Sequence, residues 1–285
     1  MYPRRRRAAV AKTPGGGRQD DLARIVARVQ STRKYRHLCP DTIRRIAADE
    51  WQKRGTFKAA VKATQSRLHQ IYAAYERGID YERAYDDLAA AYATASDAAV
   101  KNTCRRLLAR HASTEERLPI LDTLYERVFA HTGTPASLLD LACGLHPLSL
   151  PWMNLPAGTR YVAYDIDRRR IETLNRWFSL THVRGEARLQ DVICAPPNER
   201  ADVALLLKSV PCLERQQAGS ALALLDALQV RWVVVSFPIE SLGRRSKGMP
   251  AHYEGMMKEL LASRPWPVER IEIPGELVFV LDKEL

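Results

Sequence analysis

Short apolar runs alternate with helical stretches over the second half of the chain, and this alternation limits the possible folds more than any other feature. The expected strands are residues 137–142, 161–164, 187–192, 201–207 and 230–237, followed by a hairpin of 268–273 and 277–281. The expected helices between them are residues 171–180, 216–228 and 252–263. Apolar strands that are separated by helices form a parallel sheet that is covered on both faces. We therefore predict an α/β domain over residues 113–285.

Residues 20–112 have a different pattern, because their apolar residues recur at helical spacing and no strand signal interrupts them. Leu22 and Ile25 begin this pattern, and a break near Ser96 divides its last helix. We predict a separate helical N-terminal domain over this range. Residues 1–19 combine arginines with Pro and Gly and have almost nothing to bury, which predicts a disordered basic tail.

The start of the second domain has the form of a capping box. Ser113 is followed three residues later by Glu116. In a capping box, the side chain of the first residue accepts the backbone amide of the second, and the side chain of the second accepts the backbone amide of the first. This spacing predicts a helix that begins at Ser113 and runs to about His131.

The positive charge is concentrated on the N-terminal side. The chain has 44 Lys and Arg against 33 Asp and Glu, a formal net charge of +11. Residues 1–110 carry 24 basic and 11 acidic side chains, so that this part has +13 and the rest −2. A positive field confined to one segment attracts a polyanion, because each neutralised phosphate releases counterions. Nucleic acid is the expected partner, and an anionic membrane surface or a bias toward solubility are the alternatives.

Cysteine spacing and hydropathy argue against several protein classes. The five cysteines form no CxxC pair and have no histidines at zinc-ligand spacing, so we expect no metal site and a reducing, cytoplasmic compartment. No apolar run approaches the roughly 18 residues of a membrane span. The arginines at the start are not followed by the apolar stretch of a secretory signal.

The first expected strand ends in DLACGLHP, where Gly144 occupies a turn at which a nucleotide-type ligand needs close approach of the backbone. The second expected strand ends at Asp165, 25 positions after Asp140. This is the place of the acidic residue that accepts hydrogen bonds from ribose hydroxyls in dinucleotide-binding folds. The alternatives are a plain strand-to-loop turn at Gly144 and a helix N-cap at Asp165, a role that Asp167 fits better.

Three further positions follow strands and are expected at the ligand crevice. Asp191 is a candidate to accept a hydrogen bond from an adenine amine, and a loop Asp bonded to its own backbone is the alternative. Lys208 would stand near a reacting base, unless it is a solvated strand end. The loop RRSKG, which includes Arg245, suits phosphate contacts, unless it is an ordinary surface loop.

Together these motifs resemble one family. The runs LLDLACGLHPLSLPWMNLP, YDID, LQDV, LLLKSVPCLERQ and SFPIESLGRRSKGM, with HASTEERL before them, are similar to the aminoglycoside-resistance methyltransferases that modify N7 of guanine 1405 in the decoding site of 16S ribosomal RNA. The similarity covers about residues 20–285. It implies a class I (Rossmann-like) methyltransferase sheet that ends in a hairpin, S-adenosyl-L-methionine as cofactor, and the 30S subunit as substrate.

The resemblance also implies roles for individual positions. The residues implied to contact the cofactor are His111, Arg117, Ala142, Gly144, Asp165, Ile166, Asp191, Val192 and Leu207. Among them, Arg117 would hold the carboxylate of S-adenosylmethionine, Asp165 the ribose hydroxyls, and Asp191 the adenine. The residues implied to lie near the target guanine are Lys208, Arg245 and Glu276.

Methylation at guanine N7 needs no general base, because N7 carries a lone pair in the plane of the ring and the sulfonium methyl is already activated. We therefore expect the residues near the guanine to position it after it is flipped out of its helix. The helical domain is expected to grip the RNA, and the enzyme is expected to act as a monomer in the cytoplasm. The methylated base carries a positive charge that would repel cationic aminoglycosides.

Three other functions compete with this interpretation. A small-molecule methyltransferase would share the fold but would not need a large basic helical domain. A non-catalytic RNA-binding protein could keep an inactive methyltransferase domain, but the chain retains Arg117, Asp165 and Asp191. A nicotinamide dehydrogenase shares the first half of the sheet, but the LACGLHP turn and the terminal hairpin argue against it.

Overall fold

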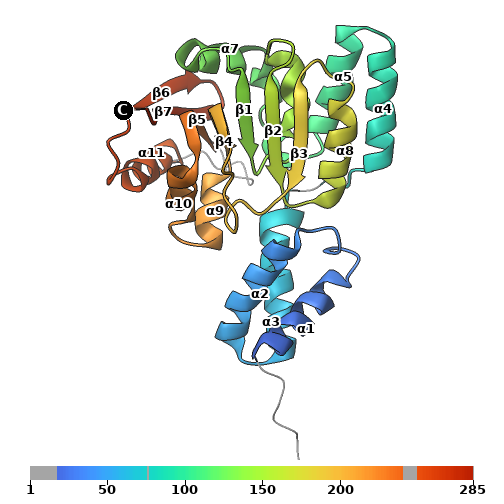
Figure 1. Ribbon diagram of the computed structural model, residues 1–285, viewed down its shortest axis with the longest axis vertical. Coiled ribbons are helices and arrows are strands. Elements are labelled where there is room, and N and C mark those ends of the chain that lie inside the picture. Colours follow the sequence, from blue (N-terminus) through green and yellow to red (C-terminus); the bar gives the residue numbers. More distant parts are fainter. Residues whose placement is uncertain (1–17, 76, 240–248, 285) are drawn as a thin grey trace, which may run out of the picture.

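The computed structural model describes residues 18–75, 77–239 and 249–284. Its centre is a seven-stranded sheet in the order β3-β2-β1-β4-β5-β7-β6 (Figure 1). The strands are β1 (Ser137–Leu141), β2 (Arg160–Asp165), β3 (Arg184–Leu189), β4 (Arg200–Leu207), β5 (Gln229–Pro238), β6 (Val268–Ile273) and β7 (Glu276–Asp282). Strands β1 to β5 are parallel, and β7 lies antiparallel between β5 and β6. The expected parallel sheet with a terminal hairpin is confirmed.

Helices cover both faces of this sheet. One face carries α4 (Tyr81–Ala93), α5 (Asp97–Leu108), α7 (Leu121–Thr132) and α8 (Arg168–Phe178), and the other carries α9 (Val210–Gln216), α10 (Ser220–Ala227) and α11 (Met249–Leu260). Successive strand residues point to opposite faces, so that Leu138 and Leu205 belong to the first core and Leu139 and Leu206 to the second. Within the described ranges, no helix has the length and hydropathy needed to cross a membrane.

The first three helices form a unit of their own, which we call the N-terminal lobe (residues 18–73). It consists of α1 (Arg18–Gln30), α2 (Pro40–Arg54), α3 (Phe57–Leu68) and the π-helical turn His69–Ala73. Ile25, Ile43 and Leu68 are fully buried in its separate core. The lobe lies beyond the carboxyl ends of β1, β2 and β3 (Figure 1). Its position makes it a second wall for whatever binds at those strand ends.

The structure differs from the expected helical domain of residues 20–112. Leu88 of α4 and Leu108 of α5 are 0% exposed and belong to the core on the first face of the sheet. Helix α4 packs against α8 in the same layer. Helical periodicity finds the apolar face of each helix but does not say which core that face joins. Of the expected disordered tail, residues 1–17 fall outside the described residues, and the remaining two begin α1.

The expected helix from Ser113 to His131 is divided in the structure. A short helix, α6 (Ala112–Glu115), begins directly after His111. The N-cap is His111 and not Ser113, and the amide of Glu116 donates to the carbonyl of Ala112, so that the expected capping box is not formed. The Oγ atom of Ser113 hydrogen bonds to Nδ1 of His111 instead. Pro119 has no amide hydrogen, and it lies in a 3-10 turn that separates α6 from α7.

Gly185 in β3 lies against the ring of Phe178, and a methyl group at this position would come within 2.0 Å of Phe178 Cδ1. We expect Gly185→Ala to lower the free energy of unfolding by about 1–3 kcal/mol, because the buried ring must leave its place. Urea denaturation measures this loss. Gly255→Ala in α11 is the control, because nothing lies within 4 Å of its added methyl group and alanine favours a helix. Equal stability of Gly185→Ala and the wild type would contradict the packing.

Candidate functional site

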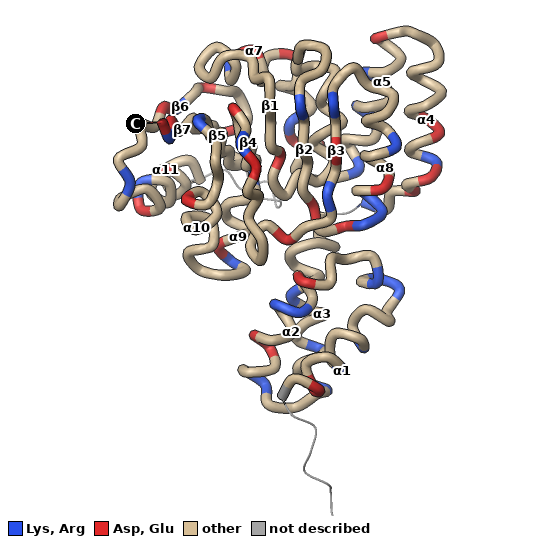
Figure 2. The backbone as a smooth tube through the Cα atoms, viewed as in Figure 1, with Lys and Arg blue, Asp and Glu red and all other residues tan. Residues whose placement is uncertain are grey.

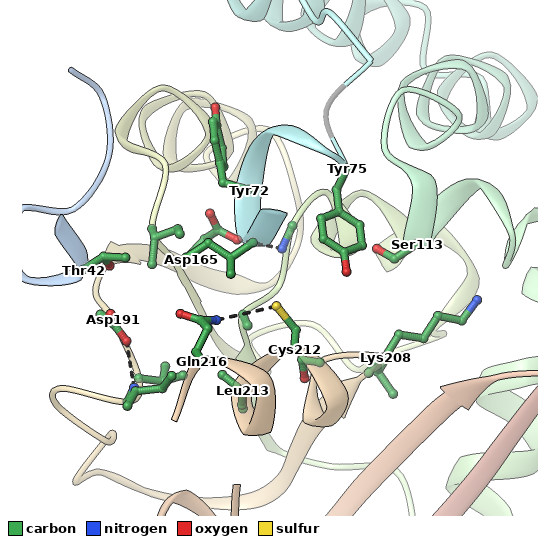
Figure 3. Close-up of a pocket in the computed structure, with 18 of the residues that line it drawn as sticks. Thr42, Tyr72, Tyr75, Ser113, Asp165, Asp191, Lys208, Cys212, Leu213 and Gln216 are labelled. Carbon is green, nitrogen blue, oxygen red and sulfur yellow. Dashed lines mark hydrogen bonds between the residues drawn. The ribbon is translucent and has the colours of Figure 1, made fainter. Parts of the chain in front are cut away.

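A pocket opens at the carboxyl ends of the central strands, between the sheet and the N-terminal lobe (Figure 3). The residues that line it include Thr42, Ile71, Tyr72, Tyr75, His111, Ser113, Ala142, Gly144, Asp165, Ile166, Asp191, Val192, Leu207 and Lys208. Strand β1 lies between β2 and β4, so that the chain changes direction across the sheet at β1. Such a switch point is where open α/β sheets bind their ligands.

Most residues expected around a cofactor come together in this pocket. All of them except Arg117 line it, and Lys208 does so as well. Neither Arg117 nor Glu276 is among its lining residues. Arg245 lies outside the described residues.

The turn after β1 has an unusual backbone conformation. Ala142 and Gly144 both have positive φ angles, 51° and 55°. A Cβ atom at Gly144 would lie 3.1 Å from Cε1 of His111, so any side chain there would press on the ring. Both the positive φ angle and the contact with this ring therefore favour glycine at the turn. A positive φ at a residue other than glycine, as at Ala142, is typical of strained backbone at binding sites.

Asp165 is held by three hydrogen bonds at the end of β2. Its Oδ2 accepts the amide of Gly144 at 2.9 Å, which ties the carboxylate to the glycine turn. Its Oδ1 accepts the amide of Asp167 at 2.9 Å and Nη1 of Arg170 at 2.6 Å. The N-cap of α8 is Asp167, which accepts the amide of Arg169. Asp165 is therefore not the N-cap and remains placed at the pocket.

Asp191 follows β3 and is 4% exposed. Its Oδ1 accepts the amide of Ile193 at 2.9 Å, as expected for a loop Asp that bonds to its own backbone. Its Oδ2 accepts Nε and Nη2 of Arg45 at 3.2 and 2.9 Å, and Arg45 belongs to α2 of the lobe. The carboxylate thus joins the lobe to the sheet at the pocket wall.

A buried ion cluster lies at the ends of β4, β5 and β7. Nε and Nη2 of Arg117 donate to Glu276 at distances from 2.7 to 3.2 Å, and Oγ of Ser236 donates to the same carboxylate. Nζ of Lys208 lies 2.9 Å from Oε2 of Glu116 and 3.4 Å from Oε2 of Glu276. The Arg117 and Glu276 side chains are 2% and 0% exposed.

Two expected roles fall on this cluster. Arg117 was expected at the carboxylate of the cofactor and Glu276 near the target guanine. The structure pairs these two side chains with each other, and both roles stay predictions. Burial alone would raise the pKa of Glu276. Attraction to Arg117 and Lys208, with hydrogen bonds from Arg117 and Ser236, outweighs burial and lowers the pKa to about 2. Glu276 is therefore ionised at neutral pH and serves as a counter-charge for two cations.

His111 adds a neutral ring to the pocket. It stacks on Tyr75, with the ring centroids 6.0 Å apart. Burial, followed by the charges of Arg170, Arg117 and Arg77, lowers the pKa of His111 to about 3. The imidazole is therefore uncharged over the physiological range of pH.

No motif in the sequence marks the residues that the N-terminal side contributes. Thr42, Tyr72 and Tyr75 line the pocket, and Arg45 reaches Asp191 across 146 positions of the chain. Their helical spacing indicates only which side of a helix they occupy. Their role follows from the docking of the lobe on the sheet, which has no local signature.

The ion cluster makes stability depend on pH in a predictable direction. The pKa of folded Glu276 lies below its ordinary value of 4.5, so its contribution is complete above pH 4.5 and is lost as the pH falls toward about 2. Glu276→Gln leaves the buried Arg117 without its counter-charge and Lys208 with Glu116 alone, and we expect the free energy of unfolding at pH 7 to fall by about 3 kcal/mol. Urea denaturation at pH 7 and pH 3 measures the difference from the wild type.

This difference should shrink at pH 3, because the wild type then loses part of the same contribution. Glu269→Gln is the control, because the Glu269 side chain is 63% exposed, and it should change stability by less than about 0.5 kcal/mol. A difference between Glu276→Gln and the wild type that stays the same at both pH values would contradict the assignment.

Comparison with known proteins identifies the family. The sequence model of the family described as ribosomal RNA methyltransferase (FmrO) matches residues 31–280. A relative from Frankia casuarinae is 41% identical over 272 residues, which cover 94% of this chain and 96% of the relative. A relative from Micromonospora rosea is 39% identical over 272 residues, with 94% and 98% covered. Both are named 16S rRNA (guanine(1405)-N(7))-methyltransferase.

Solved structures agree over almost the whole chain. The 16S rRNA methyltransferase RmtF, in complex with S-adenosyl-L-homocysteine, has a TM-score of 0.81 and 31% identity, and the match covers 94% of this chain and 100% of RmtF. The 16S rRNA methylase RmtB has a TM-score of 0.76 and 34% identity, with 92% and 98% covered. The sheet topology and the pocket agree with the sequence comparisons. The chain belongs to the FmrO family of ribosomal RNA methyltransferases.

Proposed function

We propose that this protein transfers the methyl group of S-adenosyl-L-methionine to N7 of guanine 1405 of 16S ribosomal RNA, in the 30S subunit, and so confers aminoglycoside resistance. One observation carries the proposal. Gly144, Asp165 and Asp191 lie in a row in one pocket, at the ends of the adjacent strands β1, β2 and β3. The names of the relatives from Frankia and Micromonospora support the target nucleotide.

The pocket fits the parts of S-adenosylmethionine. Gly144 permits close approach of the backbone, the Asp165 carboxylate beside it can accept ribose hydroxyls, and Asp191 can accept the amine of adenine. The other residues proposed to contact the cofactor are His111, Ala142, Ile166, Val192 and Leu207. When bound, the cofactor supplies a methyl group that is already activated by the sulfonium charge.

The protein's part in the reaction is positioning. Guanine N7 has a free lone pair, so no side chain has to remove a proton before attack. Lys208 stands at the edge of the pocket, and its Nζ is held by Glu116 and Glu276, so its place relative to the strand end is fixed (Figure 3). We assign it to holding the target nucleotide. Arg245 belongs to the same proposal, as a phosphate contact.

The N-terminal lobe supplies the charge that binds RNA. Residues 18–73 contain 13 basic and five acidic side chains. The exposed basic residues of the lobe are Arg24, Arg28, Arg33, Lys34, Arg36, Arg44, Lys53, Arg54, Lys58 and Lys62. Figure 2 shows Lys and Arg on all three of its helices. Each phosphate that they neutralise releases counterions, which favours a large RNA over a small substrate. We propose that the enzyme acts as a monomer in the cytoplasm, where 30S subunits are found.

Methylation at N7 explains resistance by electrostatics. The modified guanine carries a positive charge on its ring. Aminoglycosides are cations, and a cation placed in their binding site repels them.

A methyl-transfer assay tests the proposed function. Purified protein is incubated with tritium-labelled S-adenosylmethionine and 30S subunits from a sensitive bacterium, and the labelled nucleotide is then mapped. We expect label at N7 of guanine 1405. Label at another nucleotide would contradict the target. Cofactor binding without any label on RNA would contradict the RNA substrate and favour a small-molecule methyltransferase.

Asp165→Ala should weaken cofactor binding. Loss of a charge-assisted hydrogen bond to the ribose hydroxyls removes about 1.5–3 kcal/mol, which raises the Kd about 10- to 100-fold. Calorimetry with S-adenosyl-L-homocysteine measures the Kd, and the melting temperature reports whether the variant is folded. Asp86→Ala on the exposed side of α4 is the control and should bind like the wild type. Unchanged affinity of folded Asp165→Ala would show that the ribose binds elsewhere.

A further inference from the structure

The N-terminal lobe meets the sheet at two places that border the cofactor pocket. The first directly follows Asp165. There the amide of Cys39 donates to the carbonyl of Ile166 at 2.8 Å, and the amide of Arg168 donates to the carbonyl of His37 at 2.9 Å. These two backbone hydrogen bonds fix the lobe next to the end of β2.

The second place is at Asp191, beside the end of β3. Arg45 of α2 donates Nε and Nη2 to Oδ2 of Asp191, and the same Nη2 lies 2.7 Å from Oε1 of Gln216. Arg67 of α3 donates Nη2 to the backbone carbonyl of Gln216 at 2.7 Å. The lobe therefore holds the acidic residue at the end of β3 through a side chain of its own.

Arg45 has a specific effect on Asp191. Their side chains are 16% and 4% exposed, and a carboxylate buried to this extent needs a partner for its charge. Within the described ranges, the ion pair that the structure records at Asp191 is the one with Arg45. Two nitrogens of the planar guanidinium hold Oδ2 of Asp191, and the amide of Ile193 holds Oδ1, so that together they restrict the rotation of the carboxylate.

The two oxygens of Asp191 consequently have different tasks. Oδ2 is committed to Arg45, whereas Oδ1 accepts one backbone amide, from Ile193. A carboxylate oxygen can accept more than one hydrogen bond, so Oδ1 keeps capacity for a further donor. Thr42, three positions before Arg45 on the same helix, also lines the pocket, and its Oγ1 is buried without a hydrogen-bond partner among the described residues. Figure 3 shows Thr42 and Asp191 at the same end of the pocket.

We propose that Arg45 is a positioning residue for the cofactor: it neutralises and orients Asp191 so that the free capacity of this carboxylate faces the exocyclic amine of adenine. The adenine subsite is then complete only when the RNA-binding lobe is docked on the sheet. This inference rests on the proposed role of Asp191.

Arg45→Ala tests the inference, with Arg44→Ala as the matched control. Arg44 is the exposed neighbour on the same helix, so its loss removes the same charge from the lobe without touching Asp191. In calorimetry with S-adenosyl-L-homocysteine, we expect Arg45→Ala to raise the Kd about tenfold, which corresponds to about 1.4 kcal/mol, and Arg44→Ala to stay within about twofold of the wild type. Unchanged or tighter binding by Arg45→Ala would overturn the inference, because Arg45 would then be irrelevant to adenine or would compete with it.

Selectivity for adenine distinguishes the positioning of Asp191 by Arg45 from a general weakening of the contact between the lobe and the sheet. S-inosyl-L-homocysteine carries a carbonyl oxygen in place of the amine, and the wild type should bind it much more weakly than the adenosyl compound. In Arg45→Ala the ratio of the two Kd values should fall, because Asp191 is no longer aimed at the amine. A ratio equal to that of the wild type would assign Arg45 a structural role only, and would overturn the inference.

Two further variants keep the result interpretable. Arg45→Lys keeps the charge but loses the planar guanidinium group, so its affinity and selectivity should lie between those of Arg45→Ala and the wild type. It replaces Arg45→Ala if that variant does not fold.

Asp191→Ala tests the underlying assignment of Asp191 to the adenine. Unchanged affinity in Asp191→Ala would contradict the proposed adenine contact itself. Weak binding by Asp191→Ala together with wild-type binding by Arg45→Ala would overturn the inference about Arg45 alone.

Discussion

Three buried carboxylates in or near the proposed cofactor pocket each pair with a cation, and this requirement decides which elements of the structure must meet. The pairs are Asp165 with Arg170, Asp191 with Arg45, and Glu276 with Arg117. A buried carboxylate that loses its partner costs several kcal/mol, so these contacts hold as long as the protein is folded. They fix α8 to the end of β2, the N-terminal lobe to the end of β3, and the segment before α7 to the start of β7.

The consequence is a site whose charged side chains are oriented before a ligand arrives. Asp165 is bonded to the glycine turn through Gly144, and Lys208 is held by Glu116 and Glu276. A methyl transfer to guanine N7 needs alignment rather than acid or base chemistry, and fixed side chains supply alignment. The lobe has two tasks in this scheme, because it carries the basic surface and also forms one wall of the pocket.

Much of the sheet and the motif positions could be predicted from the sequence, because strand ends and the Gly144 turn have local signatures. The apolar runs locate the strands, and the spacing of Asp165 after the turn places it in the pocket. Contacts between distant segments could not be predicted in this way. Nothing near Arg117 in the sequence indicates that Glu276 is its partner, and Arg45 lies 146 positions from Asp191. Periodicity also could not assign α4 and α5 to the core of the sheet rather than to the lobe.

A crystal structure with S-adenosyl-L-homocysteine tests the central claim most directly, namely that the cofactor binds between the sheet and the docked lobe. The account predicts ribose hydroxyls at Asp165, the adenine amine within about 2.7–3.2 Å of Asp191, and Arg45 still paired with the same carboxylate. An adenosine bound away from both carboxylates would contradict the claim, and so would a lobe that has separated from Asp191 in the complex.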